Sequence, residues 1–248
     1  MDIFSNLDKK IRIIDEKSWF KHCAPAGGNE HWESKRSAKE MALFWLNKAK
    51  QDMFLKYLSK FLPINLKFEF AIPEYPTKFD EFKNPRKNDL YIKGISGDKE
   101  ILILIEGKAD EPYGNYYFKD EWITSVIQKS SNKNSKKLDR IINLYHRCNG
   151  EAQILDIRYQ LIFWLAGAIE EAKRRGVADI ILISQEFHSD KTKVNNIQRN
   201  TSDLNTFVSF LSKNTIKDIK DNRIEGPINN DLTDNKNVYI GKYISGSK

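Results

Sequence analysis

The sequence is poor in cysteine and histidine, which excludes two common ways of stabilising a small fold. Its two cysteines, Cys23 and Cys148, are too few for a disulfide framework. The four histidines are scattered, and no spacing of cysteine and histidine resembles a zinc site. We therefore expect a cytoplasmic protein, in a reducing compartment, that is held together by an apolar core.

Long apolar runs are missing as well. The apolar stretch from Leu161 to Ile169 is far shorter than the roughly 20 residues of a membrane-spanning helix. Residues 1–15 contain no apolar segment of the kind found in a signal peptide. A GxxxxGK[ST] loop is also absent, which argues against an NTPase. We expect no membrane partner.

Length and charge suggest one domain with an anionic partner. A chain of 248 residues with 40% apolar content can form a single cored domain over residues 1–248. Its net charge of +7 favours nucleic acid, although a lysine-rich surface can also serve solubility alone. Two basic stretches rich in serine and asparagine are predicted to be exposed loops that follow a phosphate backbone. Their basic residues are Lys133, Lys136 and Lys137 in the first stretch, and Lys191, Lys193 and Arg199 in the second.

Hydrophobic periodicity predicts an α/β fold. The predicted strands cover residues 66–72, 89–95, 100–107 and 179–187. The predicted helices cover residues 34–50, 52–61, 136–147, 156–175 and 204–211, with Gly176 ending the fourth of them. The segment from about 214 to 248 is rich in asparagine, aspartate and lysine, and we expect it to be irregular apart from a closing strand over 238–244.

The stretch from Asn88 to Gly114 contains the residues best suited to chemistry. The run Ile101–Ile105 is rich in β-branched residues and predicts a central strand, which ends in Glu106-Gly107-Lys108. A turn near residues 96–98 would place Asp89 and Glu106 on paired antiparallel strands, at the same open end. Because strand side chains alternate, Lys108 should share a face with Glu106.

Two carboxylates at neighbouring strand ends can hold a hard divalent cation through their oxygens. We therefore predict that Asp89 and Glu106 bind a metal ion. Lys108 could then orient the attacking water or offset negative charge on a phosphate. The alternatives are a turn aspartate, a paired structural glutamate and a surface lysine.

Asp89 followed by Glu106-Gly107-Lys108 resembles the PD-(D/E)XK nuclease superfamily, although Asn88 stands where that superfamily loosely has proline. The string EGKADEPYG, with RYQLIFWLAGAIEEA downstream and HWESKRSAKEMALFWL upstream, also resembles an uncharacterised bacterial domain family that is associated with the superfamily. This second resemblance covers about residues 20–210. Together they imply a restriction-endonuclease-like αβββαβ core, with a central mixed sheet flanked by helices.

The resemblance further implies a DNA endonuclease that depends on Mg²⁺, which Mn²⁺ can replace, with a role in restriction or phage defence. It implies that the carbonyl of Gly107 is a third metal ligand and that Glu111 and Gln160 lie beside the site. A glutamine that opens a buried helix needs hydrogen-bond partners in any case. The alternatives are an RNA nuclease and an inactive module that binds nucleic acid or protein, and a homodimer is compatible with each.

Overall fold

A seven-stranded sheet forms the centre of the computed structural model, which describes residues 1–248 except 26, 63–64, 83 and 246–248. Its strands are β1 (Asp2–Ile3), β2 (Lys67–Thr77), β3 (Arg86–Ser96), β4 (Lys99–Lys108), β5 (Asp179–Phe187), β6 (Arg223–Ile228) and β7 (Asn237–Ser245). Their spatial order is β1-β2-β3-β4-β5-β7-β6. β2, β3 and β4 are antiparallel, whereas β5 and β7 continue the sheet in parallel. The predicted α/β class with a central mixed sheet is confirmed.

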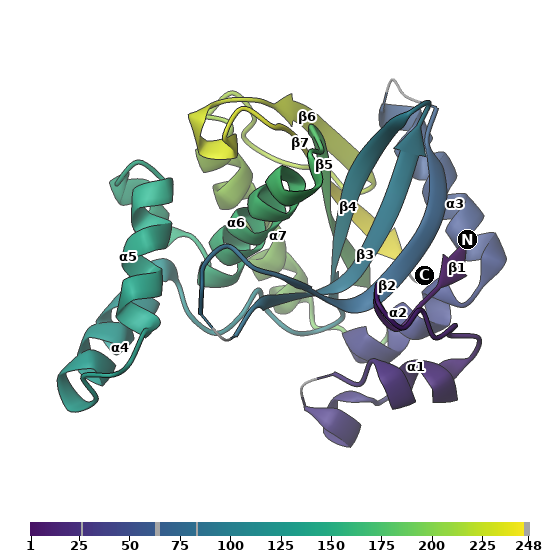
Figure 1. Ribbon diagram of the computed structural model, residues 1–248, viewed down its shortest axis with the longest axis horizontal. Coiled ribbons are helices and arrows are strands. Elements are labelled where there is room, and N and C mark those ends of the chain that lie inside the picture. The colour runs from purple at the N-terminus through teal and green to yellow at the C-terminus, as the bar shows by residue number, and fades with distance from the viewer. Residues whose placement is uncertain (26, 63–64, 83, 246–248) are drawn as a thin grey trace.

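Helices cover both faces of this sheet (Figure 1). They are α1 (Glu16–His22), α2 (Ser37–Trp45), α3 (Lys48–Phe61), α4 (Phe118–Ser131), α5 (Lys137–Arg147), α6 (Tyr159–Arg175) and α7 (Val194–Leu211). Successive side chains of β4 point to opposite faces of the sheet, so the strand contributes to two hydrophobic cores. Leu102 and Leu104 pack in the core with α6 and α7, whereas Ile103 and Ile105 pack in the core with α2 and α3. α4 and α5 form a hairpin that projects from one side of the body (Figure 1).

The order of elements around the candidate site agrees with the prediction. Along the chain, α3 is followed by β2, β3 and β4, then by the helices α4, α5 and α6, and then by β5. β3 and β4 pair as a hairpin in which Ser96 and Lys99 form the pair next to the turn, and Gly97 in the turn has φ +59°. Asp89 and Glu106 therefore lie on adjacent antiparallel strands at the end opposite this turn.

Two predicted boundaries were wrong. The helix expected over 34–50 ends at Trp45, and Asn47 caps the next helix by accepting a hydrogen bond from the Lys50 amide. The strand expected over 66–72 continues through Pro73 and Pro76 to Thr77. Both prolines lie beyond the short stretch where β1 covers the outer edge of β2, so their missing N–H groups interrupt no described pairing there.

The prediction of irregular structure beyond residue 214 was also wrong. β6 and β7 pair with each other, and β7 pairs in parallel with β5, which buries Val238 and Ile240 in the α6–α7 core. Most of the polar residues that suggested a loop lie before β6 or between β6 and β7. The closing strand expected over 238–244 is confirmed as β7, and the last predicted residues, 246–248, lie outside the described residues.

Two helix starts differ from the prediction. α6 begins at Tyr159, after a short 3₁₀ turn over Ala152–Asp156, and Gly176 ends it with φ +68° as predicted. α7 begins at Val194, ten residues before the expected start at 204. Part of the second basic stretch is therefore helical. The side-chain amides of Asn196 and Asn200 donate to the backbone carbonyls of Asp110 and Glu111. These tertiary contacts outweigh the weak helix propensity of the asparagines.

Candidate active site

Side chains from two strands and one helix meet where β3 begins and β4 ends. Lys108 Nζ lies 2.7 Å from Glu106 Oε1. Gln160 Nε2, in the first turn of α6, donates to the same oxygen over 2.6 Å. Alternation places Glu106 and Lys108 on the face of β4 that α6 covers, which is why a glutamine of α6 reaches them. The sequence-predicted group of Glu106, Lys108 and Gln160 is thus in contact.

Asp89 joins this group through the backbone of Gly107. The Gly107 amide donates to Asp89 Oδ2 over 2.7 Å, just beyond the last ladder pair, Leu90 with Ile105. A Cβ at position 107 would lie only 2.8 Å from Met41 Cγ on α2. Glycine between Glu106 and Lys108 therefore lets α2 pack closely while the backbone meets Asp89.

Glu106 is a buried anion with three donors around it. Lys108 and Gln160 contact Oε1, and the guanidinium of Arg86 contacts Oε2. Burial alone would raise the pKa of Glu106, but Arg86 and Lys108 together hold it below its ordinary value. An ionised carboxylate has about four acceptor positions, so three donors leave about one for a further partner.

A cavity of about 480 Å³ lies on the side of Asp89 that faces α2. Its lining includes Asp89, Glu74, Glu111 and Lys87. Burial, and next the charge of Glu106, raise the pKa of Asp89. Burial likewise raises the pKa of Glu74 to about 7. The positive charge near these two carboxylates is therefore too small to offset their burial. A bound cation would supply that charge and favour their ionised forms.

Glu74 was missed because Pro73-Glu74-Tyr75-Pro76 was predicted to end a strand. The strand instead continues, and Glu74 is half-buried beside Asp89 with φ +51°, in the left-handed region. The only signal available was an acidic residue between two prolines.

The residues present fit a Mg²⁺ ion with few protein ligands. In the part of the chain that the structure describes, no group of three or more His, Cys, Asp or Glu side chains is placed to hold one ion. Mg²⁺ usually keeps several waters and binds one or two carboxylates together with substrate phosphate. Asp89, the remaining acceptor position of Glu106 and the carbonyl of Gly107 supply only hard oxygen donors, as this cation requires.

Glu111 and Tyr113 follow β4 and border the site in different ways. Glu111 Oε2 accepts hydrogen bonds from the amides of Ala109 and Asp110, at 3.2 and 2.9 Å, and the residue lines the cavity of Asp89. The ring of Tyr113 is fully buried, with Lys108 Nζ 5.3 Å from its centroid, and its hydroxyl contacts Ser184 on β5. Tyr113 and Ser184 were not predicted, although a polar residue inside an apolar strand is a usable signal.

The two predicted basic stretches lie in different places. Lys133, Lys136 and Lys137 lie where α4 connects to α5, on the projecting hairpin, and Lys137 pairs with Glu121 at 2.5 Å. The second stretch lies nearer to the site, because the amide of Lys193 donates to Asp110 over 2.8 Å. Lys191 is exposed beside it, whereas Arg199 is half-buried on α7.

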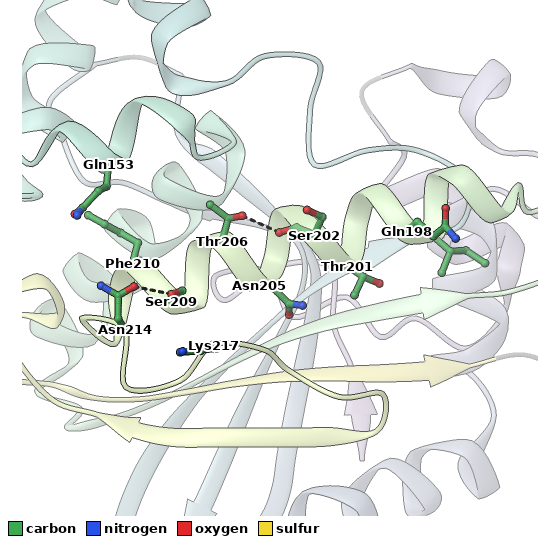
Figure 2. Close-up of a pocket in the computed structure, with 11 residues that line it drawn as sticks. Gln153, Gln198, Thr201, Ser202, Asn205, Thr206, Ser209, Phe210, Asn214 and Lys217 are labelled. Carbon is green, nitrogen blue, oxygen red and sulfur yellow. Dashed lines mark hydrogen bonds between the residues drawn. The ribbon is translucent and has the colours of Figure 1, made fainter.

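A second cavity, of about 690 Å³, follows the outer face of α7 (Figure 2). Amide and hydroxyl side chains such as Thr201, Asn205 and Asn214 line it, and no carboxylate does. None of the predicted site residues borders it. Its lining offers no ionisable group except Lys217, so the candidate site is assigned to the end of β4.

The fold and the site together define an α/β protein with a carboxylate–lysine cluster at one edge of a mixed sheet. The chain belongs to the family described as "Domain of unknown function (DUF6946)", whose model matches residues 13–246. No curated protein and no solved structure matches the chain significantly. Among the described residues, no helix is long and apolar enough to cross a membrane.

Proposed function

We propose that this chain is a metal-dependent nuclease that hydrolyses phosphodiester bonds of DNA, with Mg²⁺ as the cofactor and Mn²⁺ as a replacement. The observation that supports it most strongly is the meeting of Asp89, Glu106 and Lys108 on two antiparallel strands, with Gln160 against them. This is the arrangement that the resemblance to PD-(D/E)XK nucleases implies. The order of helices and strands around it is also the one expected.

Asp89, Glu106 and the carbonyl of Gly107 would hold the cation, which supplies a water of lowered pKa and a polarised phosphate when bound. Lys108 keeps its ammonium next to this position, where it offsets the negative charge that develops on the phosphate. Gln160 fixes the plane of the Glu106 carboxylate through its amide. Glu111 contributes negative charge to the cavity that Asp89 lines.

The net charge of +7 supports DNA as the partner, and the backbone of Lys193 contacts Asp110, which follows β4. Cys23 and Cys148 are free and buried, in keeping with a reducing cytoplasm. A role in restriction or phage defence is part of the proposal and rests on the resemblance alone.

The test is a cleavage assay on plasmid DNA, linear DNA and RNA, each with Mg²⁺, with Mn²⁺ and with EDTA. We expect DNA to be cut with either metal and left intact in EDTA. Asp89→Asn changes one charge in the cavity without changing its size, so it is the matched inactive variant. Cleavage that is equal in wild type and Asp89→Asn would show that another protein or another site is responsible.

A second function has one observation in its favour. Arg86 and Lys108 already surround Glu106 with positive charge, and this pair of cations could take the place of the metal ion in a protein without nuclease activity. The chain would then bind nucleic acid without cutting it. Binding of oligonucleotides together with no detectable Mn²⁺ binding would favour this alternative.

A further inference from the structure

We propose that Arg86 is a positioning residue that holds Glu106 in the orientation needed for metal binding, an inference that rests on the proposed nuclease function. Arg86 did not form part of the predicted motif. It opens β3, three residues before Asp89, and it is 8% exposed. Its guanidinium contacts Glu106 Oε2, whereas Lys108 and Gln160 contact Oε1.

Arg86 approaches Glu106 from inside the protein. A Cβ built on Gly167 of α6 would lie 3.7 Å from Arg86 Cβ and 2.4 Å from Thr77 Oγ1, so α6 packs directly over this part of the sheet. The arginine is enclosed between α6 and the strands, and its guanidinium contacts Glu106 Oε2. It is therefore placed to act on Glu106.

Arg86 pairs through one carboxylate oxygen, as Arg158 does with Asp203 in another buried ion pair, whereas the partly buried pair of Arg140 with Asp80 uses both oxygens. Arg140 contacts both oxygens of Asp80, through Nε at 2.8 Å and through a terminal nitrogen at 3.1 Å. Such two-point pairing is the strong geometry for arginine and a carboxylate. Arg86 instead contacts a single oxygen of Glu106, and its buried Nε has no hydrogen-bond partner.

This single contact has a consequence for the carboxylate. A two-point pair with Arg86 would add a fourth donor to Glu106. The single contact leaves the buried Nε–H of Arg86 without a partner, which is unfavourable for stability. The observed arrangement divides the donors between the two oxygens and leaves about one acceptor position unused. Three donors from three directions fix the plane of the carboxylate, so the unused position has a defined direction. Lys108 and Gln160 fix the position of Oε1, and Arg86 fixes the position of Oε2.

The experiment compares Arg86→Met, Arg86→Lys and the control Arg140→Met, which breaks a partly buried ion pair away from the site. For each we would measure kcat, DNA affinity in EDTA, Mn²⁺ affinity by electron paramagnetic resonance, and thermal stability. Arg86→Met should lower Mn²⁺ affinity and kcat by about 10–100-fold, as the loss of a group that orients a metal ligand does. DNA affinity should change less than about twofold. Arg86→Lys, which restores the charge, should recover part of the Mn²⁺ affinity.

The control separates positioning from stability. Arg140→Met should lower the melting temperature but leave kcat and Mn²⁺ affinity of the folded protein unchanged. Equal kcat and equal Mn²⁺ affinity in folded Arg86→Met and wild type would overturn the proposal and leave the nuclease function standing. A gain of Mn²⁺ affinity in Arg86→Met would overturn it as well, because Arg86 would then occupy the place of the metal. A wild type that neither cuts DNA nor binds Mn²⁺ would remove the nuclease function itself.

Discussion

Gln160 Nε2 donates a hydrogen bond to Glu106 Oε1 over 2.6 Å and thereby connects the first turn of α6 to the end of β4. The two residues are 54 positions apart in the sequence, and the α4–α5 hairpin is inserted between them. Gln160 Oε1 also lies 3.4 Å from Lys108 Nζ. One side-chain amide thus contacts both the anion and the cation of the site.

Replacing Gln160 by alanine tests this contact. Gln160→Ala should lower the cleavage rate by about 10–100-fold, the usual range when a group that orients a metal ligand is lost. Raised Mg²⁺ should restore part of the rate. Gln198→Ala, on the exposed face of α7, is the matched control and should have the wild-type rate. A normal rate in Gln160→Ala at low Mg²⁺ would assign the hydrogen bond to folding alone.

Lys108→Met tests the role of the ammonium, because methionine keeps the buried apolar stem. The proposed role lies in the transition state, so kcat should fall by about 10²–10³-fold, as when one stabilising donor is removed. DNA affinity in EDTA should stay within about twofold of wild type. Glu106 should keep its contacts with Arg86 and Gln160 in this variant, because neither contact involves Lys108. A large loss of affinity at unchanged kcat would instead make Lys108 a contact for ground-state phosphate.

Much of the fold could be predicted from the sequence, because local pattern and tertiary environment agree in its centre. β4 and β5 are continuous apolar runs, and both were expected where they occur. The errors lie where tertiary contacts override a local signal. Pro73 suggested the end of a strand, but the outer edge of β2 has no described pairing there and tolerates it. The start of α7 is polar and was predicted to be a loop, yet hydrogen bonds from Asn196 and Asn200 hold it as a helix.

The residues of the candidate site also fall into those that the sequence predicted and those that it did not. Asp89, Glu106 and Lys108 were found because a strand pattern and a hairpin place them together. Arg86 and Glu74 were not found, because their proximity depends on the exact register of β2, β3 and β4. A one-residue shift in pairing would turn a side chain to the other face of the sheet, and composition does not specify that shift.

The raised pKa of Glu74 predicts how stability depends on pH without metal. Burial moves this pKa from 4.5 to about 7 in the folded protein. The folded state therefore binds more protons than the unfolded state between these values, and the free energy of unfolding should fall as pH rises from about 4.5 to about 7. Glu74→Gln should remove much of this fall. Urea unfolding in EDTA at several pH values measures it, and an equal slope in both proteins would contradict the shift.

The two basic stretches can be compared by the salt dependence of DNA binding. Lys191→Gln combined with Lys193→Gln should flatten the slope of log affinity against log salt by about 0.9 for each lost phosphate contact. The triple change of Lys133, Lys136 and Lys137 to glutamine should have a smaller effect, because Lys137 is paired with Glu121 on the projecting hairpin. The reverse order of effects would show that DNA lies along α4 and α5.

The last prediction concerns the two proposed metal ligands. Asp89→Ala and Glu106→Ala should each abolish Mg²⁺-dependent cleavage, but their effects on stability should have opposite signs. Asp89 has a raised pKa through burial and the charge of Glu106, so its removal should stabilise the metal-free protein at neutral pH.

Glu106 neutralises Arg86 and Lys108, so its removal leaves two buried cations unpaired and should destabilise the protein. Thermal melting in EDTA and in Mg²⁺ measures both effects. Mg²⁺ should raise the melting temperature of wild type more than that of either variant. An equal rise in all three proteins would place the metal elsewhere.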